Sequence, residues 1–331
     1  MYARITGLPD PGAELNTIAD AANAPRQNVI YADPTDHFFN VWKNPGHTAA
    51  LSVNFSPYYM PGADPETGSP VSEDDMRRAL DAIAPFADTI RTFGVSGEMN
   101  KLYKIGKLEY NYRIYAGCWI GSNYEPQLVR NELETLAEIG NLGYADILIV
   151  GSEGLLRGDY NAKDLIGWLN DLRGLLHKDI PIGVSETAAS LLGYPEVVGA
   201  ADVAMFTLYP YFNNTPVDEA VGEFERVYRL LQKAAGHTKL ICSETGWKFE
   251  SDEKSAQAGP ENGARYLEDI YAFSQAENLE ICIFEALAED WKARYDDDGW
   301  NLLDADLVPR PAVSEMLERI SESVRLQKHD D

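Results

Sequence analysis

Residues 239–247 read Lys-Leu-Ile-Cys-Ser-Glu-Thr-Gly-Trp, and the fold prediction begins from this stretch. It starts as a short apolar run typical of a buried strand, and it stops at a carboxylate, a glycine and a large aromatic residue. Glu244 therefore lies where the predicted strand ends. A strand buried on both faces excludes charge from its middle, so an acid at its end is either solvated there or chemically active there.

The same pattern of an apolar strand, a turn and an amphipathic helix recurs along the chain from residue 49. Strands are predicted at 50–55, 89–93, 112–119, 145–150, 180–184, 203–208 and 280–284, in addition to the one that leads to Glu244. Helices are predicted after Ser72 and at about 128–139, 162–176, 217–235, 263–276 and 311–326, with only a short helical turn around Leu102. Eight strands with mostly helical connections favour an α/β fold of the (β/α)8 TIM barrel type over a doubly wound sheet.

The predicted barrel occupies most of the chain. Prolines interrupt residues 1–48 at short intervals, so this segment is predicted to be an irregular N-terminal extension. Residues 49–326 form the predicted barrel, and residues 327–331 form a short tail. The composition does not shift after residue 49, so a second domain is not expected.

Composition limits the function classes. The chain has 331 residues, of which 45% are hydrophobic, and this is enough for a one-domain barrel with a large core. Its 53 acidic and 28 basic residues give a net charge of -25, which would repel nucleic acid and anionic membranes. A neutral substrate is therefore the expected partner, and the sequence leaves the oligomeric state open.

The three cysteines, Cys118, Cys242 and Cys282, lie in or beside predicted buried strands, where a thiol behaves as a small apolar group. Their odd number, wide spacing and lack of a Cys-x-x-Cys pair argue against a disulfide framework and a zinc site. The sequence has no signal peptide pattern and no apolar run of about 18 residues. A cytoplasmic location is predicted for the sequence as given, and a periplasmic or extracellular one if a leader has been removed.

Acids and aromatic residues gather at the predicted strand ends. They are Glu153, Glu186, Glu244, Glu285 and Glu289, with Tyr58, Trp119, Tyr209, Tyr211 and Trp247. In a barrel of parallel strands these residues face one shared cleft. Carboxyl groups among aromatic rings suit a carbohydrate substrate, because the rings stack on sugar faces and two carboxyl groups cleave the glycosidic bond.

None of the five histidines lies at a predicted strand end, so a multi-histidine metal hydrolase is not expected and no cofactor is predicted. A cage of carboxylates for magnesium stays open as an alternative. Among the acids, Glu153 and Glu244 stand out because each follows a small residue at the end of a strong strand and has glycine close by. Any single acid at a barrel rim is more often solvated or ion-paired than catalytic.

Several stretches resemble motifs of glycoside hydrolase family 17, the β-1,3-glucanases and glucanosyltransferases. Residues 150–157, Val-Gly-Ser-Glu-Gly-Leu-Leu-Arg, resemble the fourth-strand motif of this family, whose usual form is Val-Gly-Asn-Glu-Val-Leu-Leu-Arg. Residues 243–247, Ser-Glu-Thr-Gly-Trp, and 208–212, Leu-Tyr-Pro-Tyr-Phe, are similar to its seventh- and sixth-strand motifs. Further matches lie at 54–58, 90–94, 289–292 and 300–306, so that the resemblance spans residues 49–313.

The resemblance implies roles for individual residues. Glu153 would be the general acid/base, Glu244 the nucleophile and Tyr209 a donor to the nucleophile. Glu289 and Lys292 would contact sugar hydroxyls. Independently of the resemblance, the aromatic residues Tyr58, Trp119, Tyr211 and Trp247 are predicted to line the sugar sites, and a packed lid is the equal alternative for Trp247. Ser152 stands where the family has an asparagine that holds the 2-hydroxyl of the sugar, and serine is too short to reach the same place directly.

The sequence thus predicts a retaining glycoside hydrolase or transglycosylase that acts on β-glucan or its oligosaccharides, with β-1,3-linked glucan first among them. Ser152 motivates one alternative, a catalytically weak or silent barrel that binds glycan. A second alternative is a magnesium-dependent lyase or isomerase that uses the rim carboxylates.

Overall fold

The computed structural model describes residues 49–122, 124–250 and 257–330. The predicted N-terminal extension, residues 1–48, lies outside the described residues. Within the described ranges, no helix combines the length and the apolar composition needed to cross a bilayer. The location of the protein stays a prediction from the sequence.

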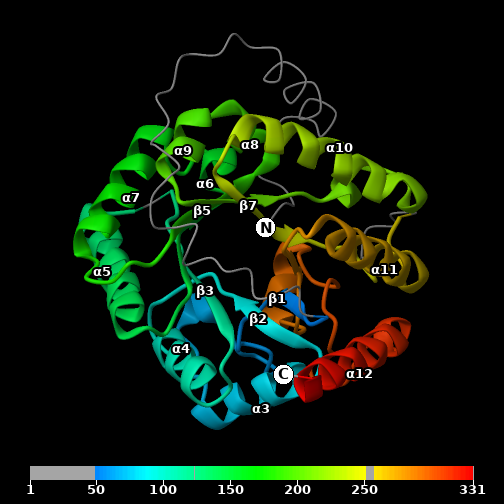
Figure 1. Ribbon diagram of the computed structural model, residues 1–331. Coiled ribbons are helices and arrows are strands. Elements are labelled where there is room, and N and C mark those ends of the chain that lie inside the picture. The colour runs from blue at the N-terminus through cyan, green and yellow to red at the C-terminus, as the bar shows by residue number, and fades with distance from the viewer. Residues whose placement is uncertain (1–48, 123, 251–256, 331) are drawn as a thin grey trace.

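Eight parallel strands form a closed barrel in which β1 pairs with both β2 and β8, and helices surround it (Figure 1). This architecture confirms the predicted (β/α)8 barrel. The strands are β1 (Leu51–Asn54), β2 (Ala87–Arg91), β3 (Arg113–Cys118), β4 (Ile147–Ser152), β5 (Ile182–Thr187), β6 (Val203–Thr207), β7 (Lys239–Thr245) and β8 (Ile281–Ile283).

The helices and short 3-10 turns connect the strands in the order that the sequence predicts. The α-helices are α3 (Glu73–Ile83), α4 (Met99–Leu108), α5 (Pro126–Leu142), α6 (Gly154–Arg157), α7 (Ala162–Leu175), α8 (Ala188–Gly193), α9 (Pro195–Ala200), α10 (Val217–Ala235), α11 (Pro260–Glu277) and α12 (Ser314–Asp330). The 3-10 turns are η1 (Pro65–Thr67), η2 (Pro210–Asn213), η3 (Asp290–Tyr295) and η4 (Pro311–Val313).

Five helices differ from the prediction: α4, α6, α8, α9 and α12. Neither α6 nor α9 was predicted. The region around Leu102 is a ten-residue helix, α4, which sequence reasoning reduced to a turn because it begins without a side-chain cap and contains a glycine. The short helix α8 was not predicted, although the hydroxyl of Thr187 caps it by accepting the N–H of Ser190 at 3.1 Å. The last helix, α12, continues to Asp330 and includes residues assigned to the tail.

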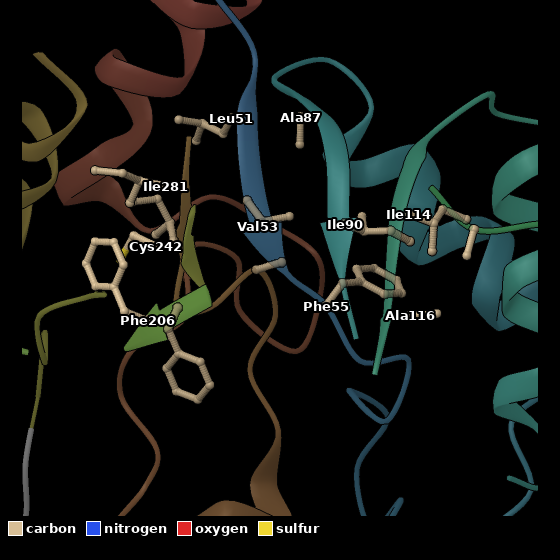
Figure 2. Close-up of a cluster of buried hydrophobic side chains, with 14 of the residues drawn as sticks. Leu51, Val53, Phe55, Ala87, Ile90, Ile114, Ala116, Phe206, Cys242 and Ile281 are labelled. Atoms are coloured by element: carbon tan, nitrogen blue, oxygen red, sulfur yellow. The ribbon is translucent and has the colours of Figure 1, made fainter. Parts of the chain in front are cut away.

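Alternate residues along the strands belong to two different apolar clusters. Residues such as Val53, Ile90, Phe206 and Ile281 belong to the large core that the strands share with the surrounding helices (Figure 2). The intervening residues form a second cluster inside the barrel, which consists of Tyr115, Ile147, Ile149, Val203, Met205, Ile241 and Cys282. This alternation follows from the period of two in a β-strand.

Polar side chains replace apolar ones inside the barrel toward the carboxyl ends of the strands. Asn54, Arg91, Ser185 and Ser243 are all buried there. Since the carboxyl ends of parallel strands share one face of the barrel, this polar layer forms the floor of the face on which such folds carry their sites.

Gly246 provides a test of this packing. A Cβ atom at this position would collide with the backbone carbonyl oxygen of Phe284, which cannot move independently of β8. We expect Gly246→Ala to lower the free energy of unfolding by about 1 to 3 kcal/mol, as overpacking does. Gly167→Ala is the control, since its Cβ atom meets open space on α7, and alanine is the better helix former. Urea denaturation measures the free energy of unfolding of both variants. Equal values for Gly246→Ala and Gly167→Ala would contradict the expected collision with Phe284.

Candidate active site

A cavity of about 550 Å³ lies at the carboxyl ends of the strands, and Glu153 and Glu244 are among the acids that line it. It brings together eight of the ten predicted site residues: Tyr58, Trp119, Ser152, Glu153, Tyr209, Glu244, Glu289 and Lys292. The remaining two, Tyr211 and Trp247, are not part of its lining. Residues from six of the eight strand ends thus meet at one place, as a barrel requires.

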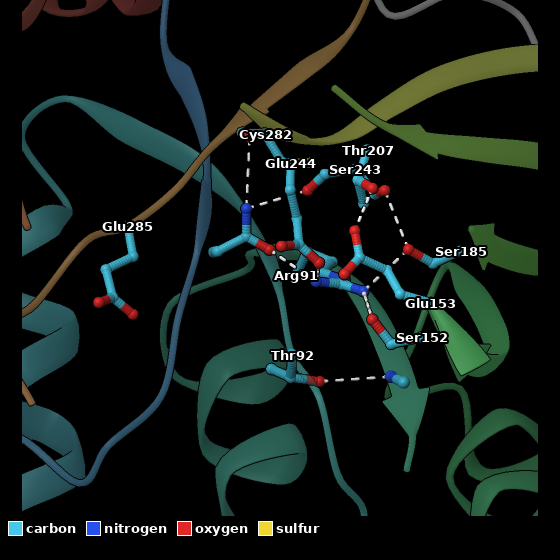
Figure 3. A network of polar contacts seen from close by, with 12 residues as sticks. Arg91, Thr92, Ser152, Glu153, Ser185, Thr207, Ser243, Glu244, Cys282 and Glu285 are labelled. Carbon is cyan, nitrogen blue, oxygen red and sulfur yellow. Dashed lines mark hydrogen bonds and ion pairs between the residues drawn. The ribbon is translucent and has the colours of Figure 1, made fainter. Parts of the chain in front are cut away.

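Glu244 near the end of β7 has two polar partners. Nη1 of Arg91 lies 2.5 Å from its Oε1 atom (Figure 3). The hydroxyl of Tyr209 donates a hydrogen bond to Oε2 at 3.0 Å. The side chain is 9% exposed, so the ion pair with Arg91 is shielded from water. These contacts orient both oxygens of the carboxyl group at the cavity, as a nucleophile requires.

Arg91 ties this carboxylate to three other strands. Its Nη1 atom also donates to Oδ1 of Asn54, and its Nη2 atom donates to the hydroxyls of Ser152 and Ser185, each at 3.0 Å. The sequence analysis included Arg91 in a matched motif but gave it no role. The signal was an arginine in the middle of the predicted strand 89–93, because a buried charge requires a partner.

Glu153 lies at the turn between β4 and α6, in a different environment. Its backbone is left-handed, with a φ of 54°, and its N–H donates to the carbonyl oxygen of Ser185 at 2.8 Å. The hydroxyl of Thr207 donates to its Oε1 atom. Burial, and secondly the charge of Glu244, raise the pKa of Glu153 to about 7. This carboxyl group can therefore carry a proton near neutral pH and give it to a leaving group.

Glu186, at the end of β5, shares the Ser-Glu-Thr context of Glu244 but is closed off from solvent. Its carboxyl group accepts the hydroxyl of Tyr160 at 2.9 Å and the N–H of Leu155 at 3.2 Å. Burial raises the pKa of Glu186 to about 8. Because its partners belong to the segment directly after Glu153, Glu186 supports the turn that carries the acid.

Lys292 lies between two acids that follow β8. Its Nζ atom pairs with Glu285 and lies 2.7 Å from Oε2 of Glu289. Glu289 also accepts the hydroxyl of Ser56 at 2.5 Å and Nε1 of Trp291 at 3.0 Å. Of the two acids, only Glu289 lines the cavity. Glu285 is not part of the lining, and burial raises the pKa of Glu285.

The aromatic residues divide into two groups. Trp119 is 37% exposed at the end of β3, and the guanidinium of Arg157 lies 4.5 Å from the centre of its ring. Trp247 is fully buried, its Nε1 atom donates to the carbonyl oxygen of Gln257 at 2.7 Å, and its ring packs against the ring of Tyr211 at 5.4 Å. The sugar contacts expected for Trp247 and Tyr211 do not fit these positions. Both residues pack beneath the cavity.

Sequence reasoning did not assign six other aromatic residues that line the cavity. They are Phe93, Phe212, Phe284, Trp291, Tyr295 and Trp300. The parts of the chain that the structure describes contain no group of three or more histidine, cysteine or acidic side chains placed to hold a metal ion. The acids at the strand ends are bonded instead to Arg91, Tyr160 and Lys292.

A (β/α)8 barrel that presents an arginine-paired glutamate and a second glutamate of raised pKa to one cavity has the pair of carboxyl groups that glycoside hydrolases use. Residues 52–300 match the BtgE/BtgC glycoside hydrolase domain, and the chain belongs to this family.

The names of relatives with similar sequences agree with this family. A protein of Aspergillus niger named "Putative glucan endo-1,3-beta-glucosidase btgC" is 25% identical over 279 residues, which cover 74% of this chain and 40% of that protein. The chain thus spans less than half the length of that relative. The "Glucan 1,3-beta-glucosidase" of Schizosaccharomyces pombe is 24% identical, with 74% of this chain and 81% of that protein covered.

Solved structures agree in fold. The glycoside hydrolase family 17 β-1,3-glucanosyltransferase of Rhizomucor miehei is similar with a TM-score of 0.69 and 25% identity, covering 80% of this chain and 96% of that one. An active-site mutant of the Rhizomucor miehei enzyme in complex with laminaritriose gives a TM-score of 0.70 at 24% identity. These findings confirm the family resemblance that the sequence motifs indicate.

The pKa of Glu153 can be measured directly. We expect Glu244→Gln to lower it from about 7, because the substitution removes a negative charge but leaves the burial that accounts for the larger part of the increase. An NMR titration of labelled carboxyl carbons gives both values. Glu268→Gln, which changes an exposed acid on α11, is the control. An unchanged pKa in Glu244→Gln would show that the two groups do not interact.

Tyr209 donates to Glu244, so Tyr209→Phe removes one hydrogen bond to the candidate nucleophile. A hydrogen bond to a charged group contributes about 1.5 to 3 kcal/mol, so kcat should fall about 10- to 100-fold with a small change in KM. Tyr228→Phe, which removes a hydroxyl bonded to Gln232 on α10, should leave both constants unaltered. An equal decrease in kcat in both variants would show that the hydrogen bond from Tyr209 to Glu244 has no specific role in the reaction.

Proposed function

We propose that this protein cleaves β-1,3-linked glucan or its oligosaccharides with retention of configuration and passes the glycosyl group to water or to another sugar. The observation that carries the proposal is the contrast between two carboxyl groups at one cavity. Glu244 is bonded to an arginine and a tyrosine hydroxyl, whereas burial gives Glu153 a pKa of about 7. A retaining glycosidase needs one ionised carboxylate and one protonated carboxyl group.

In the first half of the reaction, Glu153 gives its proton to the glycosidic oxygen while Glu244 attacks the anomeric carbon. The bond from that carbon to the oxygen breaks, the leaving sugar departs as an alcohol, and an ester to Glu244 forms. In the second half, Glu153 as carboxylate removes a proton from water or a sugar hydroxyl. The resulting oxygen attacks the same carbon and releases Glu244 as carboxylate.

Arg91 and Tyr209 have a defined part in both halves. Their donors face the carboxylate of Glu244, so they orient it for attack and stabilise it again when it leaves. Deglycosylation is assisted because Glu244 leaves as a carboxylate that is already paired.

The substrate assignment uses the names of the relatives together with the lining of the cavity. A neutral glucan is compatible with the net charge of -25, and Tyr58, Trp119 and Trp291 offer rings to sugar faces. Glu289 and Lys292 are proposed to bind sugar hydroxyls. Ser152 lines the cavity, but its hydroxyl accepts a hydrogen bond from Arg91, so in this chain it supports the nucleophile's partner.

A second candidate function is glycan binding with weak turnover. The engagement of Ser152 with Arg91 favours it, since a hydroxyl contact to the reacting sugar that strengthens in the transition state contributes to catalysis. Both candidate functions use the same binding site, and they differ in the rate at which bound glycan is cleaved.

The deciding experiment incubates wild type, Glu244→Gln and Glu153→Gln with β-1,2-, β-1,3-, β-1,4- and β-1,6-gluco-oligosaccharides. We expect turnover of the β-1,3-linked series by wild type, and a loss of about 100-fold or more in both variants. NMR of the first product should show the β-anomer, which is the signature of retention. Glu268→Gln, far from the cavity on α11, is the matched control for a lost carboxylate.

Three outcomes would contradict the proposal. Release of the α-anomer would show inversion, and turnover of another linkage alone would overturn the substrate assignment. Binding of oligosaccharide by wild type and Glu244→Gln alike, without products, would favour the silent barrel.

A further inference from the structure

The described lining of the cavity is concentrated in one sector of the barrel. Most of it belongs to residues 56–69, 93–99 and 284–300, which follow β1, β2 and β8. Apart from Ser152 and Glu153, the segments at the ends of β3 and β4 contribute Trp119 and Arg157 to the lining. The cavity thus extends from Glu153 and Glu244 mainly toward the side of β8, β1 and β2.

On that side, four residues join the segment after β1 to the segment after β8. Arg294 lies 2.8 Å from Oδ2 of Asp64 and 2.9 Å from Oε2 of Glu66. The hydroxyl of Tyr295 donates to the same carboxylate of Glu66 at 2.9 Å. We call Asp64, Glu66, Arg294 and Tyr295 the clamp.

The clamp is part of the cavity wall. Both Glu66 and Tyr295 line the cavity, one from each side of the junction, and Trp291 lies on the same wall. The segment after β1 is held from within as well, because Asp64 accepts the N–H of Glu66 at 2.9 Å and its own N–H donates to Ser69 at 3.0 Å. Hydrogen bonds from Arg294 keep the pKa of Asp64 below its usual value, so the pairing persists over the neutral range.

Strand order shows which part of a sugar chain would meet the clamp. The nucleophile bonds to the glycone, and the general acid protonates the oxygen of the departing part. Glu244 is on β7, whose neighbour β8 leads into the clamp. Glu153 follows β4, whose neighbour β3 leads to Trp119 with its exposed ring.

We infer that the clamp closes the glycone end of the cavity, so that the protein acts from the non-reducing end of its substrate and releases a short glycone instead of cutting at interior bonds. The leaving part of the chain extends past Trp119. A cavity of about 550 Å³ agrees with this mode, because it has the size of a small-molecule pocket rather than that of an extended groove. This inference rests on the proposed function.

The test uses β-1,3-gluco-oligosaccharides labelled at the reducing end, together with the same compounds capped by a bulky acetal on the non-reducing terminal sugar. At low conversion, wild type should release one short unlabelled product and a labelled chain shortened by that length. The capped compounds should not be turned over. Labelled products of many lengths from the start, or equal turnover of capped compounds, would overturn the inference and leave the proposed function intact.

The double variant Arg294→Ala/Tyr295→Phe removes every contact of the clamp between the two segments. It should release longer products and turn over the capped compounds. Arg319→Ala is the control, since it removes an exposed ion pair with Glu268 between α12 and α11. Partly exposed ion pairs contribute little to stability, and a thermal melt checks that the double variant folds.

If the double variant does not fold, the capped compounds with wild type still decide the question. Product lengths of a folded double variant that equal those of wild type would show that the clamp does not set the end of the cavity. Failure of the proposed function has a different signature, because wild type would then turn over no β-1,3-gluco-oligosaccharide. That result would overturn both proposals.

Discussion

The site depends on one buried guanidinium group. Arg91 is fully buried, and a charge in such a place requires a partner of opposite charge and hydrogen bonds, which its Nη1 and Nη2 atoms make. Its partners come from β1, β4, β5 and β7, so one side chain joins strands on opposite sides of the barrel. The apolar cluster that includes Ile149 and Met205 fills the inside of the same barrel, so the polar layer rests on closely packed side chains. The carboxylate of Glu244 is therefore held by the same contacts that close the top of the barrel.

The acid is positioned by a local backbone constraint instead of an ion pair. Gly151 and Glu153 both have positive φ values, 74° and 54°, so the chain turns sharply between β4 and α6. A Cβ atom at Gly154 would collide with the ring of Tyr160, and the hydroxyl of Tyr160 in turn donates to Glu186. The strained conformation is thus fixed by close packing on one side and by a buried hydrogen-bond pair on the other. This support explains why an otherwise unfavourable backbone can place Glu153 opposite Glu244.

The sequence predicted the barrel because each buried strand is a short apolar run, and it predicted the eight cavity residues because strand ends meet on one face. It did not reveal Arg91, whose four partners lie 37 to 153 residues away along the chain. It also left the position of Trp247 open between a sugar site and a packed lid, because an aromatic residue after a strand end can turn either toward the cavity or into the wall. Here Tyr211 and Tyr266 provide apolar contacts in the wall, and burial of the large ring is favourable. Side-chain direction beyond a strand end depends on neighbours that only the fold brings together.

The two catalytic candidates illustrate how one scaffold gives the same side chain two chemical states. Both are glutamates, both are nearly buried, and both lie at the carboxyl ends of strands. The difference arises from their neighbours, since a guanidinium and a phenol donate to Glu244, whereas Thr207 donates to Glu153 and the negative charge of Glu244 acts on it. Opposite charge favours the ionised form of an acid, and burial next to like charge favours the neutral form. The different roles proposed for the two glutamates therefore follow from the position of Arg91, which pairs with Glu244.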